Sequence, residues 1–531
     1  MSNCSTGMVA AGHAATAETG ASILRSGGNA VDAAVAAIAT SFIAEPALTA
    51  PGGGGFLLIA DAAGRSILYD GFARMPTGKR VTGVEPELKA VPIDFGDTVQ
   101  SFHIGQGSVA TPSLLPMLFR AHRENGKLPL REVLAPALDA ARNGVRLNAL
   151  QASFISLLRP ILTDTPSCRA LHTSHTSGDL WREGESFRNP ELANTLEMLA
   201  IDGIEEMSHG DLAKAIVKSC SPYGLLCMDD MRSGQVQLRK PLGIHLFGGR
   251  LITNPPPSSG GLLIAFAATM LDRLYRHPET ASLPWPVLAA EGMRSASLLR
   301  QNGFDSRVHE SDISDSILNE AHIEAAAAKI RNRLRNLDSE VIKEPDNRHG
   351  STTHISVIDK HGMAVSLTSS NGEGAGIVVP GTGIHLNNML GEEDINPLGF
   401  HALPGGATLS SMMAPSIFIE KGKPSLVLGS GGSNRLRGAI LQALLRHRLL
   451  DQDIEAAVHA PRLHNESGEL DIEPELLNDH ERHLLMSLGW KLRDWKRQSV
   501  YFGGVNAITR KPNGSLNGAG DPRRGGAVAF A

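Results

Sequence analysis

The first seventy residues switch between helical and extended apolar patterns. Small and apolar residues recur at helical spacing from Ala10 to Leu24, and a second apolar run over Ala30 to Ile43 follows Asn29, a favourable N-cap. Two extended apolar segments then flank a short turn, over Phe56 to Ala60 and Ser66 to Asp70. The pattern predicts two packed helices followed by a β-hairpin.

The middle of the chain is mainly helical from Ser113 to about Arg335. Amphipathic spacing is clearest over Leu115 to Arg123 and over Leu130 to Ala141. Between Leu334 and Gly350 the composition becomes polar and charged, which is typical of an exposed linker.

The C-terminal third returns to strands. The segments Thr353 to Ile358 and Met363 to Thr368 surround the turn Asp359 to Gly362 and predict a β-hairpin, so that Thr352 stands at the start of a strand. The later apolar segments predict strands over Ser416 to Glu420 and Ser425 to Leu428 and helices over Leu436 to Leu450 and His480 to Leu488.

Composition narrows the class of protein. With 531 residues, 42% apolar and 20% charged, the chain is expected to form either two domains or one large layered domain. A net charge of -5 lacks the basic excess that binding to nucleic acid requires, which favours a small-molecule ligand. The most apolar early stretch, Ala30 to Ala44, is too short to span a membrane and contains Asp32. No basic and apolar signal is visible at the start, so a cytoplasmic location is expected.

The sequence predicts no metal and no cofactor. The four cysteines are scattered without a C-x-x-C pair, which argues against a disulfide framework or a zinc site: Cys4, Cys168, Cys220 and Cys227. His172 and His175 lie among serines and threonines without a second ligand cluster, so they are expected in a solvated loop.

Thr352 is a candidate nucleophile because of its position. A threonine hydroxyl is weakly nucleophilic, but the free α-amine of a Thr at a chain terminus can act as its base. A cut after the loop Asn347 to Ser351 would create that amine at the start of a strand. On periodicity alone, Thr352 and Thr353 are better explained as ordinary β-branched strand residues than as a catalytic site.

Several blocks, in the same order along the chain, resemble the gamma-glutamyltransferase (glutathione hydrolase) family. They are Gly27 to Ala34 with Gly52 to Phe56, Pro255 to Gly261, Thr352 to Asp359, Leu409 to Met412, and Asp521 to Arg523. The resemblance implies an α/β (α+β) fold, a four-layer αββα sandwich of the N-terminal-nucleophile hydrolase type. It also implies cleavage between Ser351 and Thr352 into a large subunit, 1–351, and a small subunit, 352–531, which assemble as a heterodimer.

The catalytic roles follow from the same resemblance. Thr352 is expected to be the nucleophile, supported by the hydroxyl of Ser370, where the family usually has threonine, with Thr368 as the nearby alternative. Gly431 and Gly432 match the family's oxyanion-binding glycine pair, although Gly429 to Ser433 would otherwise be explained as a turn.

The implied substrate is a gamma-glutamyl compound such as glutathione, with water or an amine as acceptor. Ser410 and Ser411 would bind its α-carboxylate, and Asn371 with an acid from Glu392 to Asp394 would bind its α-amine, Glu392 being in register.

Two departures from the family pattern concern this specificity. Where the family has an arginine to clamp the carboxylate, Phe72 is in register and Arg74 stands two positions later. Met389 replaces a glutamine that many members carry. Phe72 favours a rival hypothesis, an acylase of the same fold acting on another acyl group, such as a dicarboxylyl group in the related cephalosporin acylases. A binding protein without turnover is a third hypothesis, against which the presence of Thr352, Gly431 and Gly432 argues.

Overall fold

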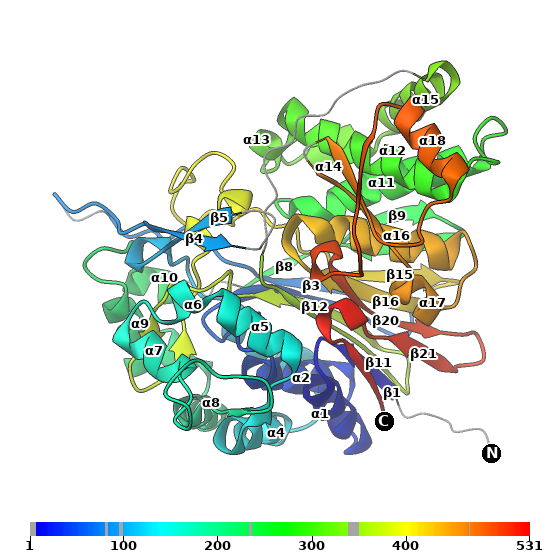
Figure 1. Ribbon diagram of the computed structural model, residues 1–531. Coiled ribbons are helices and arrows are strands. Elements are labelled where there is room, and N and C mark those ends of the chain that lie inside the picture. Colours follow the sequence, from blue (N-terminus) through cyan, green and yellow to red (C-terminus); the bar gives the residue numbers. More distant parts are fainter. Residues whose placement is uncertain (1–6, 80–82, 95–98, 233–235, 338–349, 467) are drawn as a thin grey trace.

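Two antiparallel β-sheets lie face to face between layers of helices in a computed structural model that describes residues 7–79, 83–94, 99–232, 236–337, 350–466 and 468–531 (Figure 1). The first sheet has the order β22 (Ala527–Phe530), β1 (Gly7–Ala11), β11 (Thr353–Asp359), β12 (Ala364–Ser370), β2 (Gly54–Ala60), β3 (Ser66–Gly71), β8 (Gln237–Arg239). The second has the order β21 (Leu516–Ala519), β20 (Gly504–Arg510), β16 (Lys423–Gly431), β15 (Ser416–Glu420), β10 (Gly249–Thr253), β9 (Leu242–Leu246).

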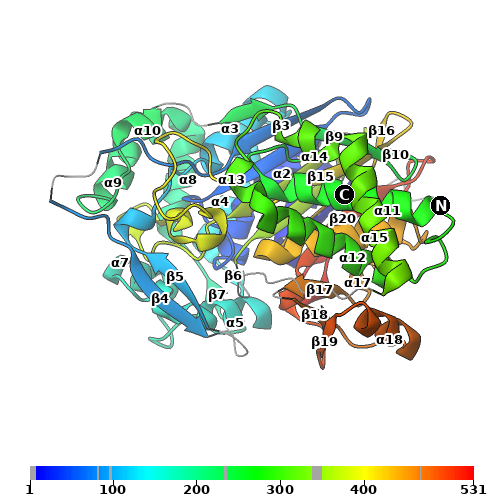
Figure 2. The ribbon, with the colours of Figure 1, turned by 90° about the horizontal axis from the view of Figure 1, so that it is seen from above.

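Helices cover the outer face of each sheet, as Figures 1 and 2 show. The first sheet is covered by α1 (Ala14–Arg25), α2 (Ala30–Ala44) and α3 (Leu114–Asn125). Helix α4 (Leu130–Asn143) packs on α2, and α8 (Pro190–Asp202) packs on α4. The second sheet is covered by α11 (Ser259–Arg276), α16 (Leu436–Arg448) and α17 (Ile454–His459). Helices α12 (Trp285–Leu299) and α15 (Glu320–Asn336) pack on α11. The predicted four-layer αββα sandwich is confirmed.

Shorter elements surround this sandwich. Beside the first sheet lie β4 (Lys89–Asp94), β5 (Val99–Ile104), β6 (Val145–Arg146), α5 (Ala149–Leu157), α6 (Arg159–Leu162), α7 (Pro166–His172), β7 (Ser186–Phe187), α9 (Asp211–Ser219), α10 (Met228–Arg232), β13 (Val378–Val379) and β14 (Ile384–His385). Beside the second lie α13 (Asp305–Arg307), α14 (Ile313–Leu318), β17 (Leu463–Glu466), β18 (Glu469–Ile472), α18 (Asp479–Ser487) and β19 (Lys491–Asp494).

The apolar core has three layers because both faces of each sheet are covered. The layer between the sheets includes Phe56, Ile358, Ile417 and Val427, all buried. A strand buried on both faces carries apolar residues in succession rather than in alternation. This explains why β2 is buried at every position.

The capping of α2 shows how the local sequence fixes this arrangement. The side chain of Asn29 accepts hydrogen bonds from the backbone N–H groups of Val31 and Asp32, and the carboxylate of Asp32 accepts one from the N–H of Asn29. This capping box begins a helix that is buried along its whole length. The predicted start and end of this helix are confirmed to within one residue.

Several predicted boundaries are wrong. The helix expected from Ala10 begins at Ala14, because Met8 to Ala11 pair with β11 and β22 as strand β1. Strands β10, β20, β21 and β22 had no counterpart among the predicted elements. Most of the predicted linker, 338–349, falls outside the described residues.

The expectation of a solvated loop is wrong for His172. Its side chain is 1% exposed at the end of α7, where the ring packs against Phe187 and His385. His175 is exposed. Cys168 and Cys220 are buried free thiols, and Cys227 is partly buried.

Residues before and after position 352 interleave within both sheets. In the first sheet β11 and β12 lie between β1 and β2, and in the second β15 pairs with β10. A cut at position 352 would therefore leave two pieces joined by strand hydrogen bonds and shared apolar layers, rather than two separate domains.

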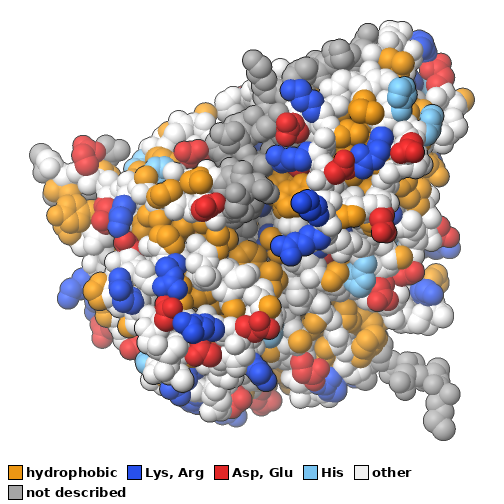
Figure 3. All heavy atoms as spheres, viewed as in Figure 1, with side chains coloured by type: hydrophobic (Ala, Val, Ile, Leu, Met, Phe, Trp, Pro, Cys, Tyr) orange, Lys and Arg blue, Asp and Glu red, His pale blue; other side chains and the backbone are white. Residues whose placement is uncertain are grey.

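Charged side chains of both signs are mixed on the face that Figure 3 shows. Lys and Arg are interspersed there with Asp and Glu rather than gathered into a basic stripe. Within the described ranges, none of the helices combines the length and apolar character needed to cross a membrane.

Candidate active site

Thr352 directly precedes strand β11 of the first sheet and lies close to strand β16 of the second sheet. Its side chain is 6% exposed, and the pairing of Thr353 with Ser369 sets Thr352 opposite Ser370 on the neighbouring strand. Strand β16 of the second sheet passes over it. A Cβ atom at Gly431 would lie 2.2 Å from the Thr352 carbonyl oxygen, so this approach requires glycine.

The peptide between Ser351 and Thr352 is held by a hydroxyl group. Ser370 Oγ donates a hydrogen bond of 2.5 Å to the Ser351 carbonyl oxygen and accepts one of 2.9 Å from the N–H of Gly372. Thr368, the alternative to Ser370, instead bonds to His354 Nδ1 at 2.8 Å inside the core. Of the two candidates, only Ser370 contacts this peptide.

Glu373 is a site residue that was not predicted. Its carboxylate accepts hydrogen bonds from Ser351, one from the backbone N–H at 3.1 Å and one from the hydroxyl at 2.5 Å. Burial raises the pKa of Glu373 to about 7, although the bonds from Ser351 and the charges of Arg524 and Arg435 act in the opposite direction. An isolated acid between glycines, directly after a strand, was the available signal in the sequence.

The raised pKa of Glu373 predicts a pH effect on stability. Between the ordinary value of 4.5 and about 7, the folded chain holds a proton that the unfolded chain has lost, so stability falls as pH rises through this window. Full ionisation costs about 3 kcal/mol at 1.36 kcal/mol per pKa unit. We expect Glu373→Gln to flatten the decline of the unfolding midpoint between pH 4.5 and 7.5. Both chains should carry Thr352→Ala, which prevents cleavage from changing the unfolding species, and equal slopes would refute the expectation.

A small cavity of about 40 Å³ adjoins Thr352 on one side. It is lined by Phe72, Gly350, Ser351, Thr352, Ser370, Met389, Glu392, Asp394, Ile395, Ser411, Met412, Met413, Ser433 and Leu436. The lining contains two acids and no Arg or Lys among the described residues. The cavity therefore favours a cationic or neutral group.

Glu392 is a buried acid in this lining whose ionised form is strongly disfavoured. Its Oε1 atom is buried without a hydrogen-bond partner among the described residues. Burial raises the pKa of Glu392 well above its usual value, and the nearby carboxylates of Glu373 and Asp394 raise it further. A Cβ atom at Gly372, whose φ is +60°, would lie 2.0 Å from Oε1, so glycine is required there. A positively charged ligand group would compensate this buried acid.

Of the residues predicted to bind the substrate, Ser411 and Glu392 line this cavity, whereas Ser410 and Asn371 are not among its lining residues. Ser411 belongs to the lining, and Ser410 Oγ is 2.7 Å from Ser259 Oγ. The Ser411 carbonyl accepts hydrogen bonds from the N–H groups of Ser259 and Gly260 at the start of α11, which fixes the serine segment. Asn371 donates to the Leu386 carbonyl at 3.3 Å, and its Oδ1 is buried with no hydrogen-bond partner in the described part of the chain.

Phe72 and Arg74 occupy different environments. Phe72 is 2% exposed, stacks on Phe56 at a centroid distance of 5.3 Å and lines the cavity. Arg74 is not among the lining residues. Burial lowers the pKa of Arg74, although the carboxylate of Asp70 acts in the opposite direction. Asp70 also accepts a hydrogen bond of 2.5 Å from Arg239. The structure thus brings Phe72, and not Arg74, to the cavity beside Thr352.

A second cavity, of about 400 Å³, opens on the other side of Ser351. Aromatic residues and arginines share its wall, including Phe154, Trp495, Tyr501, Arg435 and Arg524. Burial lowers the pKa of Arg524 to about 10, and the charge of Arg435 contributes in the same direction. This cavity offers positive charge beside the candidate cleavage point.

Fold and site together define a class. A four-layer αββα sandwich with a buried threonine at the start of an inner strand, and with a hydroxyl directed at the preceding carbonyl, is the architecture of N-terminal-nucleophile hydrolases. A family model described as Gamma-glutamyltranspeptidase matches residues 16–531. The chain therefore belongs to the gamma-glutamyltranspeptidase family of enzymes.

Relatives within this family differ in the activity that their names state. Glutathione hydrolase 2 of Arabidopsis thaliana is 30% identical over 480 residues, which cover 87% of this chain and 80% of that protein. Acylase ACY 1 proenzyme of Pseudomonas sp. (strain V22) is 30% identical over 526 residues, which cover 97% and 92%. The crystal structure of cephalosporin acylase from Bacillus halodurans shares the fold, with a TM-score of 0.83, 24% identity, and coverage of 99% of this chain and 96% of that one.

Proposed function

We propose that the chain cuts itself between Ser351 and Thr352, and that Thr352 then hydrolyses or transfers an acyl group taken from an amide. The observation that carries this proposal is the hydrogen bond of 2.5 Å from Ser370 Oγ to the Ser351 carbonyl oxygen. Negative charge would build on that oxygen during attack on the carbonyl carbon, and a preorganised donor stabilises such charge.

Self-cleavage would proceed through an ester. Thr352 Oγ attacks the Ser351 carbonyl carbon, the bond from that carbon to the Thr352 nitrogen breaks, and the nitrogen takes up the proton of the hydroxyl. Water then hydrolyses the ester, which leaves a carboxylate at Ser351 and a free amine at Thr352. Glu373, bonded to both the N–H and the hydroxyl of Ser351, supports this step by holding the carbonyl in place.

Turnover would use the new terminus. The α-amine of Thr352 accepts the proton of its own hydroxyl while Oγ attacks the substrate amide, and the leaving amine carries the proton away. The contact of Gly431 with Thr352 supports a role for Gly431 and Gly432 in binding the oxyanion. Water or an acceptor amine then releases the acyl group from Thr352.

We propose a gamma-glutamyl group as the acyl group. The buried acid Glu392 and the buried Oδ1 of Asn371, which has no hydrogen-bond partner among the described residues, are suited to an α-ammonium group, which needs hydrogen-bond acceptors and negative charge. The hydroxyls of Ser410 and Ser411 are suited to the α-carboxylate. Glutathione and related compounds carry this group.

A second candidate is an acylase of the same fold that acts on another acyl group. Phe72 supports it, because an apolar ring lines the cavity where the resemblance leads one to expect a guanidinium group. An α-carboxylate without a cation loses a charge-assisted contact worth roughly 1.5 to 3 kcal/mol.

Three anilides separate these candidates: gamma-glutamyl, which has both the amine and the carboxylate, glutaryl, which lacks the amine, and butanoyl, which lacks both. If Glu392 binds the amine, Glu392→Gln should lower kcat/KM for the gamma-glutamyl anilide by about 10- to 100-fold, the loss expected for one charge-assisted hydrogen bond. Turnover of the glutaryl and butanoyl anilides should change less than about 3-fold, within ordinary mutational scatter.

The unmutated enzyme decides the substrate class. Preference for the gamma-glutamyl anilide supports the first candidate. Preference for the glutaryl or butanoyl anilide, with Glu392→Gln leaving that preference unchanged, would replace it with the acylase. No turnover of any of the three by a cleaved chain would contradict both.

A further inference from the structure

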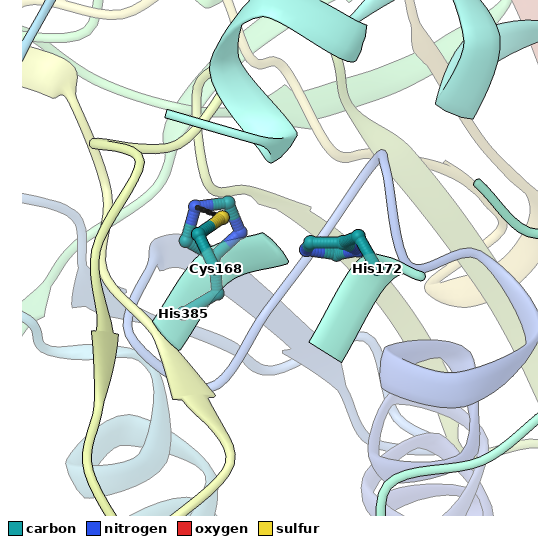
Figure 4. Close-up of side chains that lie close together, drawn as sticks. All are labelled: Cys168, His172 and His385. Carbon is teal, nitrogen blue, oxygen red and sulfur yellow. Dashed lines mark hydrogen bonds between the residues drawn. The ribbon is translucent and has the colours of Figure 1, made fainter. Parts of the chain in front are cut away.

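Three metal-ligating side chains gather in the core away from the candidate active site. Cys168 and His172 lie on α7, and His385 ends β14. Their ligand atoms all lie within 4.8 Å of one another, and all three residues are buried. Figure 4 shows the three side chains close together between the helix and the strand.

The local structure explains why residues far apart in sequence meet here. Cys168 and His172 are four residues apart on a helix, so their side chains lie on the same face. Helix α7 packs against β13, which pairs with β14. This brings Cys168 Sγ within 3.8 Å of His385 Nε2, although the two residues are 217 positions apart.

The side chain of His172 makes no hydrogen bond with any residue that the structure describes. His172 is 1% exposed, and neither of its ring nitrogens has a hydrogen-bond partner among the described residues. Burial of an imidazole without a partner is costly, and such groups in native proteins usually have an explanation such as a bound ion. The wall around His385 is close as well, because a Cβ atom at Gly374 would lie 2.2 Å from its ring.

The separation of Cys168 Sγ from His385 Nε2 suits a tetrahedral zinc ion. With Zn–S near 2.3 Å and Zn–N near 2.0 to 2.1 Å, tetrahedral geometry separates a sulfur and a nitrogen ligand by about 3.6 Å. The 3.8 Å between Cys168 Sγ and His385 Nε2 is close to this value. One thiolate with two imidazoles favours zinc over magnesium or calcium, which prefer oxygen ligands.

We propose that Cys168, His172 and His385 bind one zinc ion. Cysteine would bind as the thiolate, with its proton released to solvent, and both histidines would bind as neutral imidazoles. Three protein ligands leave one coordination position for a small ligand such as water. The sequence predicted no metal, because neither the scattered cysteines nor the pair of histidines has the spacing of a zinc-binding motif. The three ligands come together only when the fold brings His385 next to α7.

The ion would stiffen one border of the candidate active site. Asn387 follows His385 closely, and its Nδ2 donates to the carbonyl oxygens of Gly52 at 2.8 Å and Ala110 at 3.0 Å. The next residue, Asn388, accepts a hydrogen bond of 2.9 Å from the N–H of Glu373. The zinc site does not depend on the proposed function, since its ligands take no part in the proposed chemistry.

The test uses elemental mass spectrometry to measure zinc in the full-length protein. The protein is produced in the presence of zinc and then freed of loosely bound metal. The variants are Cys168→Ala and His385→Leu, and Cys220→Ala is the matched control, because Cys220 is also buried and free but lies outside the cluster. We expect one zinc per chain in the unmutated protein and in Cys220→Ala. Affinity should fall by at least about 100-fold in the other two variants.

Thermal unfolding and cobalt spectra supply independent readouts. Zinc should raise the unfolding midpoint of the metal-free protein by about 2–4 °C, and it should leave Cys168→Ala unchanged. Cobalt(II) bound to the unmutated protein should show thiolate-to-cobalt charge-transfer absorption, which covers the case in which a variant does not fold. A folded unmutated protein that takes up no zinc, or that binds cobalt without this absorption, would overturn the proposal.

Discussion

Replacement of Thr352 by alanine should abolish both self-cleavage and turnover. The variant keeps the backbone of β11 but lacks the hydroxyl that would attack the Ser351 carbonyl and later the substrate amide. Removal of a nucleophile from a catalytic unit typically lowers kcat by four to six orders of magnitude, so we expect a loss of at least about 10⁴-fold. The measurement is the rate of anilide hydrolysis together with the chain pattern on a denaturing gel.

Thr352→Ser is the control for this prediction. Serine keeps a hydroxyl group and can form the same α-amine, so the variant should still cleave and still turn over, at reduced rates. A Thr352→Ala variant that is cleaved at the same bond would show that another group performs the cut.

Loss of the Ser370 hydroxyl should slow self-cleavage by about 10² to 10³-fold. Ser370→Ala removes the only described side-chain donor to the Ser351 carbonyl oxygen, where negative charge builds as the bond is attacked. The loss of one such donor in other enzymes has an effect of this size. The measurement is the half-time for conversion of freshly made precursor into fragments.

Two variants make this result specific. Ser369→Ala alters the neighbouring residue, whose hydroxyl shares a hydrogen bond of 2.8 Å with Thr49 Oγ1 instead of contacting the scissile peptide, and it should change the half-time by less than about 10-fold. Ser370→Thr keeps a hydroxyl group at this position and should still allow cleavage. If Ser369→Ala slows cleavage as much as Ser370→Ala, the donor role of Ser370 is refuted.

Local sequence predicted those elements whose signals are complete within a few residues. The helix after Asn29 carries its own capping box, and the hairpin around Asp359 carries its own turn, so both follow from short-range rules. Strand β1 was missed because Met8 to Ala11 become extended only by pairing with β11 and β22, which lie more than 340 residues further along the chain. Propensity contains no information about such partners.

Some residues of the candidate site could likewise be named from the sequence, and others could not. Thr352, Ser370 and Gly431 were named from a family resemblance, and the fold brings them into contact. Glu373 was not predicted, because its role depends on two hydrogen bonds from Ser351 that do not follow from any sequence spacing. The environment of Arg74 also depends on the fold, since Asp70 and Arg239 come from neighbouring strands.

Intact mass spectrometry of the freshly purified chain, beside its Thr352→Ala variant, tests the central claim most directly. The account predicts two masses for the unmutated chain, which correspond to residues up to Ser351 and residues from Thr352 onward, and a single uncut mass for the variant. A single uncut mass for both proteins, even after prolonged incubation, would contradict self-cleavage. It would also contradict the assignment of Thr352 as the nucleophile, which depends on that cleavage.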